Sequence, residues 1–309
     1  MKQSTLVILV VLSVASLLAA CGGPPPPADA TVNGVTSIDR TTGEVEFSVS
    51  ALNQEGELLG DGNLSNVTAT VEQPGFAVEG DVCGTGTIED KGPLTTILTL
   101  DASGSMSSND GNRRRNGAAK LFVQRMSGED RAAVSWFSSG SISLEQELTS
   151  DKALLGAAVD RATRAGGFTN FWGSSMESVN FLGEATGANK VAVMFTDGLD
   201  TSGRATPQEV INNAQAKGVR VFMIGLGDDT RINSAEMKDV ATGTQGFYRN
   251  SSDAEGLEQL FNLTFNAAKA SGCIDITFTP VPTPGTTVSG GLTFEVNNGS
   301  FTGDYSVTF

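Results

Sequence analysis

The sequence has 309 residues, of which 39% are hydrophobic and 18% are charged, a composition typical of globular rather than disordered proteins. This length allows one α/β domain of ordinary size and a smaller neighbour. The formal net charge of −15 opposes binding to nucleic-acid phosphates, and no long basic stripe offsets it. The same charge opposes electrostatic attraction to anionic membranes, so membrane attachment needs another kind of anchor.

The N-terminus has the features of an export signal with a lipid anchor. Lys2 precedes an apolar run at 6–18, which is too short for a mature spanning helix and is typical of an export signal. The run leads into Leu-Ala-Ala-Cys at 18–21, which resembles the bacterial lipobox. The resemblance implies that a signal peptide at 1–20 is removed and that Cys21 carries diacylglycerol and palmitate. An ordinary signal peptide with an incidental cysteine is the alternative.

The residues after Cys21 predict how the chain is attached. A stretch at 21–31 contains four consecutive prolines at 24–27, which favour a semi-rigid polyproline tether. A lipid-anchored chain of this kind belongs to the bacterial cell envelope. Gly22 differs from the aspartate that retains lipoproteins in the inner membrane of some Gram-negative cells, and this favours the outer membrane.

Two β-rich segments flank the middle of the chain. In the first, at 32–82, apolar Val45, Phe47 and Val49 alternate with polar neighbours. The second, at 274–309, shows the same alternation in three short stretches. Each flank alone is too small to bury a good core, so we expect the two to form one sandwich-like β domain. Two separate β pieces remain the alternative.

The middle segment, 93–272, has a different pattern. Short continuous apolar runs are typical of strands buried on both faces, as in parallel sheets. Stretches with helical character lie between them, and an alternating stretch at 141–148 predicts an antiparallel edge strand. The expected fold is therefore α/β, with a doubly wound, mostly parallel sheet. The expected strands are 94–100, 132–137, 191–195 and 219–226, and the expected helices are 117–126, 152–163, 174–182, 207–217 and 254–270.

Cys83 and Cys273 bracket this middle segment. With Cys21 lipidated, they are the only remaining pair of thiols. An exported chain that stays in a periplasm meets an oxidising compartment, so we predict a disulfide between them.

Polar residues gather where the predicted parallel strands end, which is where open α/β sheets bind ligands. The first strand runs into Asp101, Ser103 and Ser105. A glycine-rich loop carries Thr169, and a later strand ends at Asp197. Capping of the following helices and a simple turn at Asp197 are the structural alternatives.

These residues favour a hard cation. Two carboxylates at neighbouring strand ends repel each other unless positive charge lies between them. Carboxylate and hydroxyl oxygens suit Mg²⁺ or Mn²⁺, whereas the chain has no histidine for softer metals.

Asp-x-Ser-x-Ser, a threonine after paired glycines, and Thr-Asp-Gly resemble the metal-ion-dependent adhesion site of von Willebrand factor A domains. The resemblance covers the middle segment and implies that Ser103 and Ser105 bind the cation directly. It also implies that Thr169 joins when ligand is bound, and that Asp101 and Asp197 balance charge. An acidic side chain of a protein ligand then completes the coordination. Phe168 departs from the family pattern by separating the glycines from Thr169, which leaves Ser174 and Ser175 as alternatives to Thr169.

The leading functional prediction is cation-dependent cell adhesion, meaning capture of a protein or matrix ligand at the envelope, without enzymatic activity. A second interpretation is a scaffold with a structural metal. A third, phosphoryl transfer through Asp101, is disfavoured because Ser103 stands where a second aspartate is needed. A basic run at 113–115 is either a solvated helix start or a patch that attracts acidic partners.

Overall fold

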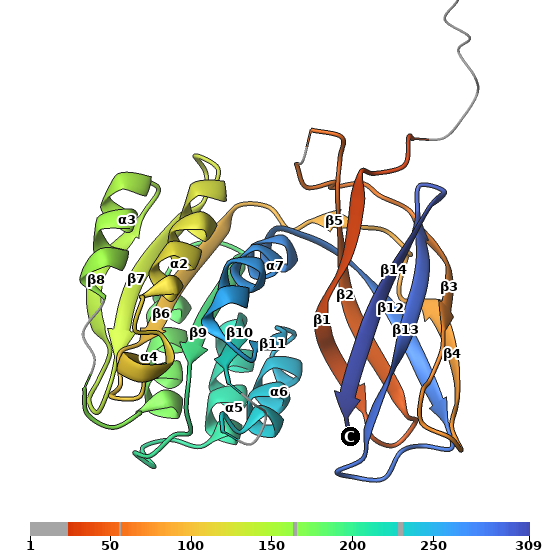
Figure 1. Cartoon of the computed structure of the whole chain (residues 1–309). Helices are drawn as coiled ribbons and strands as arrows, with labels where there is room; N and C mark the ends of the chain where they lie inside the picture. Colours follow the sequence, from red (N-terminus) through yellow and green to blue (C-terminus); the bar gives the residue numbers. More distant parts are fainter. Residues whose placement is uncertain (1–23, 56, 163–165, 228–230) are drawn as a thin grey trace, which may run out of the picture.

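The computed structural model describes residues 24–309 except 56, 163–165 and 228–230. An α/β part and an all-β part lie side by side, and the all-β part is built from both flanks of the chain (Figure 1). The predicted signal peptide and Cys21 lie outside the described residues. Within the described ranges, no helix is long and apolar enough to cross a bilayer.

Continuous apolar runs form the centre of the α/β part. All eight residues of β6 (Leu94–Asp101) are buried, as expected for a strand covered on both faces. The strand order is β11-β10-β9-β6-β7-β8, and every pairing within it is parallel except that of β8 with β7. The other strands are β7 (Arg131–Phe137), β8 (Ser143–Thr149), β9 (Asn189–Thr196), β10 (Val219–Leu226) and β11 (Tyr248–Ser251).

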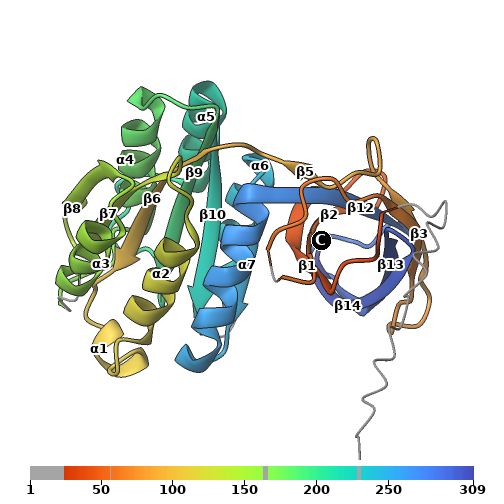
Figure 2. The same ribbon diagram turned by 90° about the horizontal axis from the view of Figure 1, so that it is seen from above.

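Helices cover both faces of this sheet, and each face has its own core (Figure 2). Phe122 and Phe261 belong to one core, and Val179 and Met237 belong to the other. The predicted doubly wound α/β class is therefore confirmed. The first face carries α2 (Arg114–Arg125), α3 (Lys152–Arg161) and α7 (Leu257–Lys269), and the second carries α4 (Phe171–Glu184), α5 (Pro207–Lys217) and α6 (Ser234–Gly243).

Local sequence sets the helix ends. The Thr206 side chain accepts a hydrogen bond from the Glu209 amide, and the Glu209 side chain accepts one from the Thr206 amide, so α5 begins with a capping box followed by Pro207. The helix ends at Gly218, whose φ of 61° is a left-handed conformation that glycine adopts without strain. These signals explain why α5 has the predicted bounds.

The all-β part consists of two packed sheets. Phe47, Ile274 and Phe294 come from both flanks and lie in one hydrophobic core. The expected sandwich-like second domain is thus present, with strands from both flanks. One sheet contains β1 (Asp29–Asp39), β2 (Glu44–Leu52), β4 (Ala77–Val82), β5 (Glu89–Asp90) and β12 (Ala270–Thr279), and the other contains β3 (Leu64–Ala69), β13 (Thr287–Val296) and β14 (Gly299–Thr308).

The two parts share one continuous sheet, which the sequence pattern did not predict. Val35 of β1 pairs with Tyr248 of β11, and the strand order continues as β4-β12-β2-β1-β11. Arg249 strengthens the junction by donating hydrogen bonds to the carbonyl oxygens of Val32 and Asn33. The α/β part is consequently joined to the β part by strand pairing as well as by the chain itself.

Two domain boundaries differ from expectation, and α6 and β11 were missed. β1 begins at Asp29, so residues 29–31 belong to a strand rather than to the tether. β12 begins at Ala270, directly after α7, so the second β flank starts earlier than 274. α6 begins without a side-chain cap, and β11 has only four residues, which are too few to show a clear pattern.

The chain enters and leaves the α/β part at one place. The Lys91 amide donates a hydrogen bond of 2.7 Å to the carbonyl oxygen of Lys269. Cys83 and Cys273 form a disulfide close to this crossing, with a Cα–Cα distance of 5.4 Å. The predicted disulfide is confirmed, and it encloses the entire α/β part.

Candidate metal centre

Two buried carboxylates lie at adjacent strand ends. β6 and β9 are parallel neighbours, with Leu100 opposite Phe195, so Asp101 and Asp197 follow at the same edge of the sheet. Both side chains are fully buried. Oδ1 of Asp101 accepts a hydrogen bond of 2.6 Å from the Ser103 amide, and Oδ2 accepts one of 2.6 Å from Thr196 Oγ1. These contacts fix the orientation of the Asp101 carboxylate.

The two serines of the first loop lie together beside Asp197. Ser103 Oγ and Ser105 Oγ are 3.2 Å apart, and Ser105 Oγ donates a hydrogen bond of 2.7 Å to Oδ1 of Asp197. The other oxygen, Oδ2, accepts a hydrogen bond of 2.7 Å from Asn109 Nδ2. Asn109 ends the short helix α1 (Met106–Asn109), which starts directly after Ser105. Four of the predicted site residues therefore lie together, and we call them the cluster: Asp101, Ser103, Ser105 and Asp197.

The glycine-rich loop lies against the first loop. The Gly104 amide donates to the carbonyl oxygen of Gly167 at 3.2 Å, and the Gly166 amide donates to that of Ala102 at 3.0 Å. Gly167 has a φ of 82°, and a Cβ there would lie 2.3 Å from Ser139 Oγ, so only glycine fits this position.

Thr169 follows in the same loop, and it is buried. Its amide donates a hydrogen bond to Thr201 Oγ1 at 3.0 Å, and its carbonyl oxygen accepts one from the Thr201 amide at 2.9 Å. Thr201 belongs to the loop after Asp197. The three loops predicted to carry the site are therefore joined by hydrogen bonds.

Ser174 and Ser175, the alternatives to Thr169, lie within α4 and are buried. Ser175 Oγ donates to the carbonyl oxygen of Phe171, a backbone group of its own helix, at 2.9 Å. Thr169 instead lies in the loop that contacts both other loops. This placement favours Thr169 over Ser174 and Ser175 as the metal-site residue of the glycine-rich loop, although Phe168 separates it from the glycines.

The electrostatics of the cluster favour a cation. Burial, together with the negative charge of Asp197, raises the pKa of Asp101 to about 6, although hydrogen bonds from Thr196 and Ser103 oppose the shift. Within the described ranges, no ion pair with lysine or arginine reaches either carboxylate. Two buried carboxylates and two adjacent hydroxyl oxygens form a donor set that fits Mg²⁺ or Mn²⁺.

Two contributors were not among the predicted site residues. Thr196 orients Asp101, and Asn109 holds Asp197. Thr196 stands inside the Thr-Asp-Gly motif, so its position was a usable signal. Asn109 lies one helical turn after Ser105, but the four-residue helix that places it beside Asp197 was not among the predicted helices.

The basic run at 113–115 is not a single patch. Arg115 is only 2% exposed, and its Nη1 lies 2.7 Å from Oδ2 of buried Asp110. Arg114 is exposed and pairs with Glu255 at 3.2 Å. The expectation of a solvated helix start fails for Arg115, because its charge is neutralised by an aspartate that directly follows α1.

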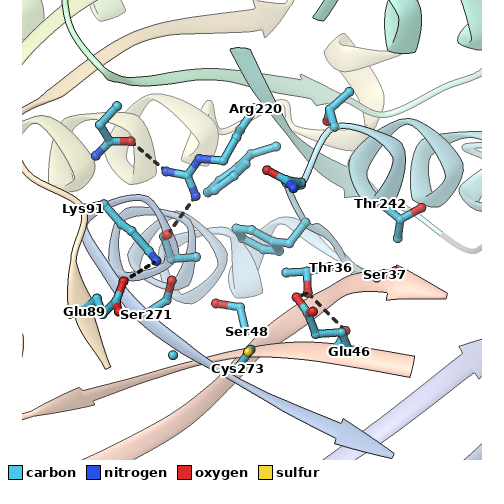
Figure 3. A pocket seen from close by; sticks show the side chains of 18 of the residues that line it. Thr36, Ser37, Glu46, Ser48, Glu89, Lys91, Arg220, Thr242, Ser271 and Cys273 are labelled. Carbon is cyan, nitrogen blue, oxygen red and sulfur yellow. Dashed lines mark hydrogen bonds and ion pairs between the residues drawn. The ribbon is translucent and has the colours of Figure 1, made fainter. Parts of the chain in front are cut away.

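A separate cleft of about 1220 Å³ lies between the two parts (Figure 3). The first residues of β9 and β10 line it, so it lies at the opposite ends of these strands from the cluster. Its walls carry charges of both signs, including Glu46, Lys91 and Arg220. Arg220 donates to Asn189 Oδ1 at 2.7 Å and to the carbonyl oxygen of Ala268 at 3.2 Å, so it stabilises the end of α7. Among the described residues, Glu46, Cys83 and Cys273 bring possible metal ligands together at this cleft, but both sulfur atoms are already bonded in the disulfide.

The family model of the von Willebrand factor type A domain matches residues 97–263, which is more than half of the chain. The chain belongs to this family. Its VWA domain therefore comprises the α/β part, with the cluster at the strand ends where the family's three motifs meet. No curated protein matches the sequence.

Solved structures support the VWA fold. Proximal thread matrix protein 1 from the mussel byssus aligns at 20% identity and a TM-score of 0.50, covering 62% of this chain and 48% of the mussel protein. A second structure of that protein, described as having a zinc-occupied MIDAS motif, aligns at 21% identity and a TM-score of 0.50, covering 58% and 47%. This chain thus spans about half the length of the mussel protein, and the likeness is one of fold.

Proposed function

We propose that this chain is a lipid-anchored protein of the bacterial cell envelope, whose VWA domain captures a protein ligand through a divalent cation. The bound ion is Mg²⁺ or Mn²⁺, and it accepts an acidic side chain of the ligand as its final donor. Ser103 and Ser105 bind the ion, Thr169 contributes in the ligand-bound state, and Asp101 and Asp197 balance its charge.

The observation that carries this proposal is the pair of buried carboxylates beside two hydroxyl oxygens. Burying two negative charges at one sheet edge is costly unless a positive charge compensates them. A divalent ion compensates both. The hydroxyl donors add no further negative charge, so the ion keeps its attraction for one more carboxylate from outside.

The proposed anchor rests on the sequence around Cys21. The folded part limits the tether to fewer residues than the predicted 21–31. The carbonyl oxygen of Pro25 accepts a hydrogen bond from Asn297 Nδ2 at 3.3 Å, and the Ala28 amide donates one to the carbonyl oxygen of Leu52 at 2.8 Å. The chain is therefore held against the β part from Pro25 onwards, with Pro27 buried.

We favour binding over catalysis. The chain contains no histidine, and the residue two positions after Asp101 is a serine rather than a second aspartate. A scaffold with a structural metal is the remaining competitor. It differs from the binding proposal in one measurable respect, which is whether a partner leaves when the metal is removed.

The test is capture of envelope proteins by the immobilised mature chain. Wild type in Mg²⁺ is compared with wild type in EDTA and with Asp101→Ala in Mg²⁺, and metal content is measured in each sample. Asp160→Ala is the matched control, because Asp160 is an exposed aspartate on α3. We expect specific partners only for wild type and the control in Mg²⁺. Unchanged capture in EDTA, with metal loss verified, would replace the binding proposal with the scaffold.

A further inference from the structure

Two exposed apolar side chains adjoin the metal-site residues. Phe168 is 71% exposed, the largest value among the exposed large hydrophobic residues of the described chain, and Leu199 is 45% exposed. Phe168 directly precedes Thr169, and Leu199 lies two positions after Asp197. Leaving a phenylalanine ring in water forfeits the free energy that its burial provides, so its position next to a binding site calls for an explanation.

The exposure of Phe168 occurs in a well-bonded loop. The Phe168 amide donates a hydrogen bond to Ser139 Oγ at 2.7 Å, and the Asn170 amide donates one to the carbonyl oxygen of Ser138 at 2.9 Å. Gly167 is held to Gly104 on the other side. The backbone on both sides of the ring is therefore fixed while the ring itself lies in solvent.

The loop that carries Leu199 is bonded to the loop that carries Phe168. The link is the reciprocal pair of hydrogen bonds between Thr169 and Thr201 described above. Phe168 and Leu199 thus stand on two adjoining loops, each of which also supplies a predicted metal-site residue. We call these two residues the apolar pair.

We propose that the apolar pair determines ligand specificity, so that the preferred partner is a protein segment with an apolar side chain next to its acidic side chain. This inference rests on the proposed function, because the acidic side chain is the one that completes the metal. The carboxylate binds the ion, and its apolar neighbour contacts Phe168 and Leu199 and removes them from water.

An arginine is linked to the metal-site cluster at the same edge. Arg231 is exposed, and its Nη2 donates a hydrogen bond of 2.8 Å to Oδ1 of Asn109, whose amide group holds Asp197. The expected acidity of the ligand segment therefore rests on the metal site itself, where a carboxylate completes the coordination of the ion.

The test uses a library of random peptides displayed on phage, selected on the immobilised mature chain in Mg²⁺ and eluted with EDTA. The same selection is made on Phe168→Ser and Leu199→Ser. Leu154→Ser is the matched control, because Leu154 is a comparably exposed leucine (49%) on α3, outside the three loops. One enriched peptide is then synthesised, and its affinity for each variant is measured together with the affinity for Mg²⁺.

We expect peptides released by EDTA from wild type and Leu154→Ser to be enriched in an acidic residue with a large apolar residue beside it. The apolar enrichment, but not the acidic one, should disappear in Phe168→Ser. That variant should bind the synthetic peptide about tenfold or more weakly, with Leu199→Ser showing a smaller loss, while Mg²⁺ affinity stays unchanged.

The other outcomes separate the two proposals. Acidic enrichment without an apolar preference would overturn the role of the apolar pair and leave the proposed function standing. If EDTA releases no enriched peptides from wild type, the proposed function fails and this inference fails with it. Self-association of the chain that requires Phe168 and persists in EDTA would assign the apolar pair to a contact between copies, and would overturn the inference.

Discussion

Ser105 donates a hydrogen bond from its hydroxyl to Oδ1 of Asp197, over 2.7 Å, so a predicted direct ligand is joined to a predicted charge-balancing group. Ser103 Oγ lies 3.2 Å from the same hydroxyl. The cluster is therefore assembled by the fold itself, from loops that follow two neighbouring strands. Loss of a single side chain should consequently alter ion binding without unfolding the domain.

Asp101→Ala should abolish binding of Mg²⁺ and Mn²⁺, with an affinity loss of about 100-fold or more, because it removes one of two buried charges that compensate the ion. Ser103→Ala should weaken the affinity by a smaller factor, since a water molecule can replace a neutral hydroxyl. Calorimetric titration of the purified chain measures both effects, and Asp160→Ala should titrate like wild type. Wild-type affinity in Asp101→Ala would contradict the assignment of the site.

Thr169→Ala should weaken ligand capture by about tenfold or more while changing Mg²⁺ affinity only slightly. The reason is its expected role as a donor that engages in the ligand-bound state. The measurement pairs calorimetry for the ion with surface binding for a captured partner or selected peptide. Equal losses in both assays would show instead that Thr169 is a permanent ligand of the ion.

Cys21→Ser should release the protein from membranes or leave it unprocessed, because a hydroxyl cannot replace the sulfur as the site of lipid attachment. Fractionation of cells, combined with mass spectrometry of the N-terminus, measures both results. Ser13→Ala, in the apolar run of the same signal, serves as a control that leaves the cysteine intact. A Cys21→Ser protein that is processed and membrane-bound like wild type would exclude a lipid on Cys21.

Replacing both Cys83 and Cys273 by serine should lower the free energy of unfolding by about 3–5 kcal/mol. The disulfide closes a loop with a sequence separation of 190, and its removal frees the unfolded chain. Urea unfolding followed by circular dichroism gives the change. Wild type treated with a reductant should unfold like the double variant. If its urea midpoint is the same with and without reductant, the disulfide does not stabilise the fold.

Asp275 of β12 should make the protein more stable in mild acid than at neutral pH. It lies opposite Glu46 of β2 and Asp81 of β4, and its Oδ1 is buried without a hydrogen-bond partner. Burial, and then the charges of Glu46, Glu44 and Asp81, raise its pKa to about 6. The folded state therefore binds this proton more tightly than the unfolded state, whose aspartate pKa is about 3.9.

It follows that the contribution of Asp275 to the free energy of unfolding is most favourable below pH 4 and is lost as the pH rises through 6. Asp275→Asn should stabilise the protein by about 1 kcal/mol at pH 7.5, a value reduced for solvent screening because the group is partly exposed. The gain should vanish near pH 4. Thermal unfolding across this pH range measures it, with Asp160→Asn as control, and a pH-independent difference would contradict the explanation.

The sequence predicted the VWA domain well because its signals are local and redundant. Strands such as β9 and β10 are continuous apolar runs, and α5 has its capping threonine, its proline and its terminal glycine. The clustering of Asp101 with Asp197 was predictable for the same reason, since both residues follow strands whose parallel order places their ends together. The hydrogen bonds of Thr169 to Thr201 were not predictable, because they depend on a contact between two loops that are distant in sequence.

Features that arise from long-range packing were not predictable. The pairing of Val35 with Tyr248 joins segments more than two hundred residues apart, and neither strand carries a signal for the other. Burial of Arg115 against Asp110 depends on how α1 meets α2. The exposure of Phe168 is equally invisible in the sequence, where an aromatic residue is most simply expected in a core.

The disulfide also determines how the molecule carries tension. Because Cys83 and Cys273 connect the β part directly, a pull between β1 and β14 passes through the sulfur bridge and bypasses the inserted residues. A load applied at the strand-end loops instead reaches the β part through the two adjacent connections at Lys91 and Lys269, and through the pairing of β1 with β11. The residues between Cys83 and Cys273 therefore lie outside the covalent path of a pull along the chain, and a pull on β1 reaches the α/β part through non-covalent contacts such as its pairing with β11.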